Sequence, residues 1–123
     1  MANIGFFDIP ADDVARAGTF YRSLLGWKVE PMKDFPFPEH QRHTIVTGTP
    51  EEGAISTGGL YKRHGPGPIL LFAEVTDIDA VLAKVEKLGG KIQLPKGGVE
   101  GIGFFAVITD TEGNAIGLHQ RPG

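Results

Sequence analysis

Two titratable side chains, His119 and Asp8, stand where a strand could present them to a pocket. His119 lies in a predicted strand two residues after Gly117, and residues two apart on a strand share a face. A histidine exchanges protons near neutral pH, so His119 is a candidate acid or base. Asp8 shares a face with Phe6, and a carboxylate in an apolar pocket could act as a base or bind a cation. The alternatives are a solvent-exposed His119 at a strand end and an Asp8 that faces solvent or helps to cap a helix.

Aromatic side chains could line a pocket for a flat, apolar small molecule. The candidates for ligand binding are Phe6, Trp27, Phe72 and Phe104. The alternative is ordinary core packing, which we expect for Phe7 and Leu71. Glu74 lies on the same strand face as Phe72, and we expect it at the rim of the pocket.

Two further motifs are weak candidates for sites. His40 and His43 have a spacing seen in zinc sites, but residues three apart on a strand point to opposite faces, which favours a surface polar pair. The glycine-rich segment 97–103 precedes a strand and not a helix, so it lacks the context of a phosphate-binding loop. We expect it to be a loop that could cover the pocket.

The composition of the chain argues against disulfide-bonded, nucleic-acid-binding and membrane proteins. The chain has 123 residues, a net charge of -3 and no cysteine, which predicts one domain, residues 1–123, without disulfides or thiolate ligands. Its acidic and basic residues are mixed along the chain, so we expect no nucleic-acid partner. No long apolar run and no signal peptide are evident, so we expect no membrane partner and a cytoplasmic location.

The elements that would position these residues follow from periodicity. Segment 4–9 reads as a strand, and apolar residues at helical spacing from Asp13 predict a helix that Gly26 ends. Three more strands are expected at 27–30, 44–47 and 56–61.

After a break at 63–68 the same pattern starts again. A strand at 69–75 leads to a helix capped by Asp77, followed by strands at 91–94, 104–109 and 115–119. Asp13 and Asp77 are 64 residues apart, and the same shift pairs the expected buried stripes of the two helices, including Leu24 with Leu88. The sequence therefore predicts two β-α-β-β-β modules, about 3–62 and 69–120.

The motifs resemble those of a known family. Residues 9–13 with Phe20-Tyr21 and 25–27, then 77–80, 88–90 and 110–114, resemble the vicinal oxygen chelate superfamily, the glyoxalase, bleomycin resistance protein and dioxygenase-like proteins. The resemblance implies an α+β fold in which two tandem β-α-β-β-β modules form a curved mixed sheet or partly closed barrel. It leaves the function open, because this fold serves several activities.

The resemblance also locates the family's metal ligands, which come from the first and fourth strand of each module. In this chain those four slots fall on Phe6, Gly59, Leu70 and Gly117. None of these side chains can ligate a divalent cation, whereas a catalytic metal needs about three N, O or S ligands from the protein. We therefore expect no metal and no cofactor.

The expected function is that of a metal-free protein that binds a small apolar or aromatic molecule, and two rival functions remain open. One rival is a glyoxalase-like lyase, isomerase or dioxygenase-related enzyme that uses His119 or Asp8, with or without a metal. Another is an interaction module with a filled interior. Family resemblance also implies a homodimer.

Overall fold

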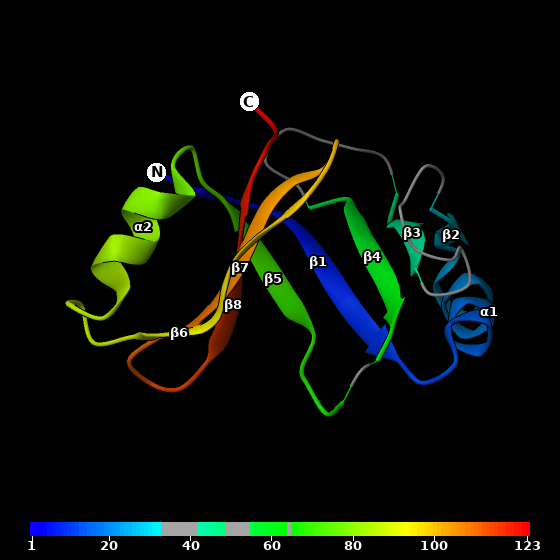
Figure 1. The fold of residues 1–123 in the computed structure, drawn as a ribbon. Helices are drawn as coiled ribbons and strands as arrows, with labels where there is room; N and C mark the ends of the chain where they lie inside the picture. Colours follow the sequence, from blue (N-terminus) through cyan, green and yellow to red (C-terminus); the bar gives the residue numbers. More distant parts are fainter. Residues whose placement is uncertain (33–41, 49–54, 64) are drawn as a thin grey trace. The chain divides into compact units, whose positions relative to one another are not determined.

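The computed structural model describes residues 1–32, 42–48, 55–63 and 65–123. The expectation for His40 falls outside these residues. The described elements, shown in Figure 1, are β1 (Asn3–Ala11), α1 (Val14–Leu25), β2 (Lys28–Pro31), β3 (Arg42–Val46), β4 (Thr57–Lys62), β5 (Leu70–Glu74), α2 (Ile78–Val85), β6 (Lys91–Val99), β7 (Gly103–Thr109) and β8 (Ala115–Gln120).

The chain divides into two compact units. The first unit comprises residues 6–69, and the second comprises residues 1–5 together with 70–123. In the first unit the strand order is β2-β3-β4-β1, and in the second it is β5-β8-β7-β6. The first and last strands of each unit, β1 with β4 and β5 with β8, are parallel, and the other neighbours are antiparallel. The predicted repeat of one β-α-β-β-β topology is confirmed.

The two helices begin in the same way. The Asp13 carboxylate accepts a hydrogen bond from the Arg16 amide at 2.9 Å, and the Asp77 carboxylate accepts one from the Ala80 amide at 3.0 Å. These bonds satisfy amides that have no partner within the helix. Gly26 ends α1 with a φ of 71°, a left-handed conformation that glycine adopts readily. The predicted caps and the predicted end of α1 are confirmed.

Two residues predicted for the buried stripes are exposed. Leu24 is 64% exposed and Leu88 is 75% exposed. Helix α2 ends at Val85, three residues before Leu88, so the helical period no longer applies there. Leu24 lies in the last turn of α1, where the helix extends past the core.

Each unit has its own apolar core on the face of the sheet that its helix covers. In the first unit, side chains of α1 pack on Ile9, Val29, Ile45 and Leu60. In the second unit, Ile78 packs with Ala106 and Leu118. Because strand side chains alternate between faces, the residues between these core positions point to the opposite face, called here the distal face of each unit.

The glycine-rich segment 97–103 is not the loop that the sequence suggested. Strand β6 extends to Val99, and Gly97 and Gly98 pair with Phe105 and Phe104 of β7. Shifts of register between Ile92 and Gly97 accommodate the extra residues of β6. A turn that contains Glu100 and Gly101 remains, closed by a bond from the Ile102 amide to the Val99 carbonyl.

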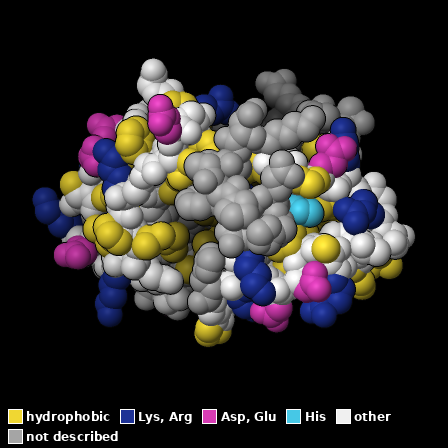
Figure 2. Space-filling view, turned by 45° about the vertical axis from the view of Figure 1, so that its right-hand side comes forward, with side chains coloured by type: hydrophobic (Ala, Val, Ile, Leu, Met, Phe, Trp, Pro, Cys, Tyr) yellow, Lys and Arg dark blue, Asp and Glu magenta, His cyan; other side chains and the backbone are white. Residues whose placement is uncertain are grey.

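Acidic and basic side chains are interspersed on the face shown in Figure 2, among scattered hydrophobic ones. None of the described helices is long and apolar enough to cross a membrane.

Candidate functional site

A partly buried ion pair occupies the distal face of the first unit. The Arg42 Nη2 atom donates to Asp8 Oδ1 at 2.8 Å, and Nη1 donates to Oδ2 at 3.4 Å. Strands β1 and β3 supply the two residues, and β4 lies between them. Asp8 is only 9% exposed, so the alternative of a solvent-facing carboxylate is wrong.

Burial sets the electrostatics of this pair. Desolvation raises the pKa of Asp8 above 3.8, although the charge and hydrogen bonds of Arg42 act in the opposite direction. The pKa of the Tyr61 hydroxyl is raised above 10.0, mainly by desolvation and then by the Asp8 charge. Tyr61 therefore lies within the electrostatic reach of the ion pair and stays neutral at physiological pH.

Gly59 makes room for the ion pair. Asp8 and Gly59 are register partners on the parallel strands β1 and β4. A Cβ atom on Gly59 would lie 2.4 Å from Arg42 Nη2 and 2.4 Å from Asp8 Oδ1. The glycine at this family ligand slot is thus a condition for the Asp8–Arg42 contact.

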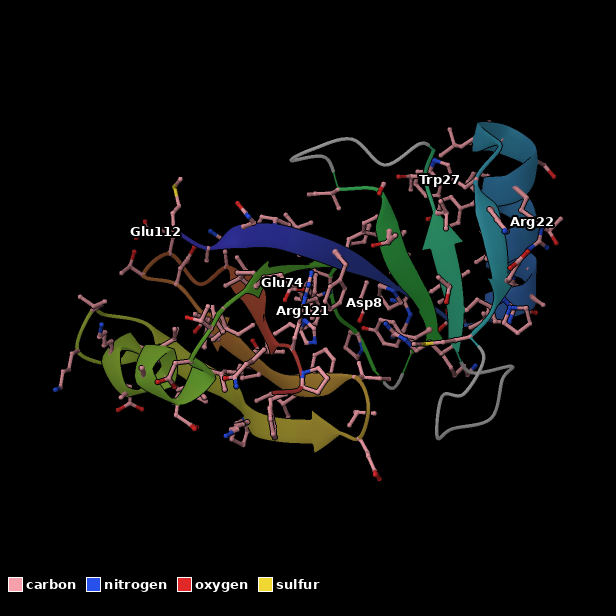
Figure 3. All side chains as sticks on the ribbon, turned by 90° about the horizontal axis from the view of Figure 1, so that it is seen from above. Asp8, Arg22, Trp27, Glu74, Glu112 and Arg121 are labelled. Carbon is pink, nitrogen blue, oxygen red and sulfur yellow. The ribbon has the colours of Figure 1, made fainter. Side chains whose placement is uncertain are left out.

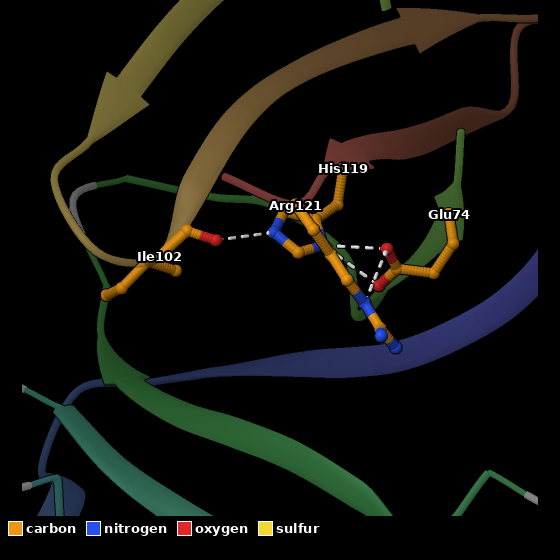
Figure 4. A network of polar contacts seen from close by, with 4 residues as sticks. All are labelled: Glu74, Ile102, His119 and Arg121. Atoms are coloured by element: carbon orange, nitrogen blue, oxygen red, sulfur yellow. Dashed lines mark hydrogen bonds and ion pairs between the residues drawn. The ribbon is translucent and has the colours of Figure 1, made fainter. Parts of the chain in front are cut away.

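A second, partly buried cluster lies on the distal face of the second unit, where β5 and β8 bring Glu74 opposite His119. The His119 Nδ1 atom is 2.8 and 2.9 Å from the two Glu74 carboxylate oxygens, and Nε2 is 2.9 Å from the Ile102 carbonyl oxygen (Figure 4). Both partners accept hydrogen bonds, so a ring with protons on both nitrogens satisfies both contacts. The exposed Arg121 lies 3.9 Å from Glu74 and adds little.

Packing holds the His119 ring in place. The ring stacks on Phe105 with centroids 4.6 Å apart, and Phe105 in turn meets Phe72 edge-on at 6.0 Å. A Cβ atom on Gly103 would lie 3.0 Å from His119 Nε2, and one on Gly5 would lie 2.4 Å from the Glu74 side chain. His119 is 8% exposed, so the alternative of a solvent-exposed histidine at the strand end is wrong.

The predicted aromatic residues do not all lie on the distal faces. Trp27 stacks on Tyr21 of α1 at 5.2 Å and contacts Phe7, so it belongs to the helix-covered core of the first unit (Figure 3). Phe104 pairs with Gln120 on the opposite side of β7 from Phe105, is 36% exposed, and lies under the Lys96 ammonium group. Phe6 and Phe72 share strand faces with Asp8 and Glu74, as predicted.

Sequence reasoning missed Arg42 and Phe105 and placed Glu74 at a rim. The Glu74–His119 contact had a signal, because each residue stands two positions after a residue of the register pair Phe72–Gly117. From the sequence, Phe104 and not Phe105 was predicted to be the pocket residue. Adjacent residues of a strand point to opposite faces, so this difference of one position selected the wrong face. Arg42 gave no local signal, since its guanidinium reaches Asp8 from a strand 34 residues away in sequence.

The slots of the family's metal ligands do not fit a metal ion here. Gly59 is covered by the ion pair, and a Cβ atom on Gly117 would lie 2.4 Å from the Phe72 ring. Among the described residues, no three His, Asp or Glu side chains gather where they could hold a metal ion.

A pocket of about 380 Å³ lies on the helix side of the sheet of the second unit, away from the Glu74–His119 cluster. It is lined mainly by α2 and the end of β7, with Val81, Val85, Leu88 and Ile108 as apolar walls and Lys84 as a charged group. It contains neither His119 nor any other predicted site residue.

Comparison with known proteins agrees with the order of strands and motifs. Residues 3–118 match the family described as Glyoxalase/Bleomycin resistance protein/Dioxygenase superfamily. The chain belongs to this superfamily. The resemblance seen in the sequence is confirmed.

Relatives within the superfamily differ in length. A glyoxylase-like domain-containing protein of Didymella fabae is 32% identical, with 98% of this chain and 94% of that protein covered. The anthracycline biosynthesis protein DauV of Streptomyces sp. strain C5 is 27% identical over 94% of this chain, but only 46% of its own length is matched. The chain thus spans nearly all of one relative and less than half of the other.

Solved structures share the glyoxalase fold at low identity. The methylmalonyl-CoA epimerase of Mycobacterium tuberculosis superposes with a TM-score of 0.65 at 18% identity, covering 98% of this chain and 89% of that one. A hypothetical protein of Bacillus halodurans C-125 gives a TM-score of 0.70 at 13% identity, covering 99% and 96%. At such identities the likeness concerns the fold alone.

Proposed function

We propose that this glyoxalase-superfamily protein binds a small apolar or aromatic molecule and does so without a metal ion. The observation that carries the proposal is the filling of the fourth-strand ligand slots, by Asp8–Arg42 at Gly59 and by Phe72 at Gly117. At both positions, neighbouring side chains occupy the space that the Cβ atom of a metal-ligating residue would need. The chemistry that remains is binding by aromatic and polar side chains.

The binding surface we assign in the first unit is its distal face. Phe6 is half-buried and lies two residues before Asp8 on β1, so its ring shares a face with the ion pair. An apolar ring can pack on Phe6 while polar atoms of the ligand meet Arg42 or Tyr61. In the second unit Phe72 is the corresponding aromatic side chain, buried over Gly117.

A screen of aromatic and aliphatic compounds by thermal unfolding tests the proposal. A ligand at a hundredfold excess over its dissociation constant should raise the unfolding free energy by about 2.7 kcal/mol. Phe6→Gln should weaken binding but leave the fold intact, while Phe20→Gln, at an exposed phenylalanine of α1, should leave binding unchanged. Unfolding of Phe6→Gln together with no stabilising compound would instead favour the interaction module.

The metal-free part of the proposal has a separate test. Elemental analysis of protein purified without an affinity tag should find no stoichiometric transition metal. One tightly held equivalent of zinc, nickel, iron or manganese would contradict the proposal, because it would require ligands other than the four slots.

The second candidate function is a metal-independent isomerase or lyase, favoured by the partly buried Glu74–His119 pair. A carboxylate that orients a histidine is a common arrangement in acid–base catalysis. Because Ile102 holds Nε2, the turn that contains residue 102 would have to move before this nitrogen meets a substrate.

Deuterium exchange tests this candidate. Carbonyl compounds incubated with the protein in D₂O should acquire deuterium next to the carbonyl group, as followed by NMR, and His119→Asn should abolish the exchange. Equal exchange in the variant and the wild type would exclude His119 as the acid or base.

We also propose a cytoplasmic homodimer. The location rests on the lack of cysteine in the sequence, and the dimer rests on family resemblance. Light scattering at micromolar concentration should give twice the mass of one 13.2 kDa chain. A mass equal to that of one chain would exclude the dimer.

A further inference from the structure

A cationic side chain covers the fourth-strand slot of the first unit. The Arg42 guanidinium lies so close to Gly59 that a Cβ atom there would be 2.4 Å from Nη2. Its side chain is 20% exposed, compared with 12% for that of Asp8, so the arginine is the more accessible partner of the pair.

Arg42 can provide the interaction for which metal-dependent relatives would use a cation. A bound cation holds an anionic oxygen of the ligand, and a guanidinium does the same through a planar set of five N–H donors. Hydrogen bonds from a guanidinium to a carboxylate are about twice as strong as neutral ones. Phe6, two residues before Asp8 on β1, adds an apolar surface on the same strand face as Asp8.

We propose that Arg42 is the anion-recognition residue of the first unit, and that the ligand therefore carries a carboxylate beside its apolar or aromatic part. This inference rests on the proposed binding function and names the class of ligand. Asp8 holds the guanidinium over Gly59 and competes with the ligand for it.

The competition gives the two residues opposite roles. Removing the Asp8 charge should weaken the hold of residue 8 on the Arg42 guanidinium, so Asp8→Asn should tighten the binding of anions. The raised pKa of Asp8, caused mainly by desolvation, is consistent with a carboxylate that loses its charge at modest cost. A purely structural ion pair would show no such gain.

Matched acids and amides provide the probes: benzoate, phenylacetate and 2-naphthoate, each with its primary amide. At pH 7, calorimetry on the wild type should show at least one acid bound about tenfold more tightly than its amide. Asp8→Asn should increase the affinity for that acid several-fold and leave the amide unchanged.

The double variant Arg42→Gln with Asp8→Asn keeps a neutral, hydrogen-bonding pair and avoids an unpaired buried charge. It should lose the preference for the acid while its circular dichroism and melting remain native. Arg16→Gln removes the same charge at an exposed position of α1 and should retain the preference.

The outcomes separate the two proposals. If acids and amides bind equally, or if the double variant keeps the preference, the assignment of Arg42 is overturned while the binding function stands. If Asp8→Asn weakens binding of the acid in a folded protein, the competition is contradicted and the assignment fails. If neither acids nor amides bind, the binding function fails and the assignment of Arg42 fails with it.

Discussion

Asp8 shows how burial and pairing oppose each other at one residue. The Arg42 guanidinium stabilises the carboxylate by charge and by hydrogen bonds, but desolvation is the larger effect and raises the pKa of Asp8 above 3.8. A carboxyl group whose folded-state pKa is raised binds more protons in the native state than in the unfolded state over the intervening pH range. Its contribution to stability is therefore fully present below the unfolded pKa and is lost as pH rises through the folded pKa.

Replacing Asp8 by asparagine removes this dependence. The stability of Asp8→Asn relative to the wild type should increase as pH rises from below 3.8 to above the raised pKa of Asp8. Urea unfolding over a pH series measures the difference, with the exposed Asp12→Asn as control. A relative stability that instead decreases with pH would show that the pairing with Arg42 outweighs the desolvation of Asp8.

Site residues could be predicted where local sequence identifies them, and could not where their role depends on contacts between residues distant in sequence. Asp8 and His119 could be selected because residue type and strand position are local properties. Trp27 was placed on the wrong side because aromatic residues favour cores and pockets alike, and only its contacts with Phe7 and Tyr21 distinguish the two. Arg42 could not be found, because its role depends on a glycine and an aspartate on two other strands.

At the scale of elements, the helix caps are the most predictable feature. Asp13 and Asp77 each bond the amide three residues ahead, at 2.9 and 3.0 Å. This geometry follows from residue type and local spacing alone. Strand ends were less predictable: β6 extends five residues past the expected end at 94, because pairing with β7 outweighs the low strand preference of Gly97 and Gly98.

Equivalent caps should have equivalent effects. Asp13→Ala and Asp77→Ala should each lower the unfolding free energy by about 1 kcal/mol, since each leaves a helix amide without its partner. Asparagine at either position should cost much less, because its side-chain oxygen also accepts the bond. Chemical denaturation checks both pairs, and a loss at one position without a loss at the other would contradict the equivalence.

The β7–β8 loop is built around one carboxylate. Asp110 accepts hydrogen bonds from the amides of Glu112 and Asn114 and from the Asn114 side chain, and these bonds lower its pKa below 3.8. A lowered folded-state pKa gives stability that is present above the unfolded pKa and lost as pH falls through the folded one.

A carboxyl-carbon NMR titration should therefore give Asp110 a midpoint below 3.8. Asn114→Ala should shift that midpoint upward, because it removes the side-chain donor but keeps the backbone one. An unshifted midpoint in this variant would assign the effect to the backbone amides alone.

Across the whole molecule, one packing arrangement recurs at the family's ligand slots. In each unit the glycine of the last-strand slot lies opposite a first-strand residue whose side chain covers it, Gly59 opposite Asp8 and Gly117 opposite Phe72. The topology that creates these pairs could be predicted from the 64-residue repeat. The filling of the slots could not, because it depends on atomic contacts between side chains and the bare backbone.

Replacing the glycine of either slot by alanine should therefore lower the unfolding free energy. Gly117→Ala should cost about 1–3 kcal/mol, because its Cβ atom would lie 2.4 Å from the Phe72 ring in a packed environment. Gly59→Ala should cost less, since the nearest atoms are the ends of the Arg42 and Asp8 side chains, which can shift. Gly97→Ala meets no atom within 4 Å and should be close to neutral.

A double-mutant cycle isolates the contact at Gly117 from general effects of alanine in a strand. In a Phe72→Ala background, Gly117→Ala should cost almost nothing, because the ring that it would meet is gone. Equilibrium unfolding of the four proteins gives the coupling energy. If Gly117→Ala costs the same with and without Phe72, the ring does not fill this slot, and the argument against a ligating side chain there loses its basis.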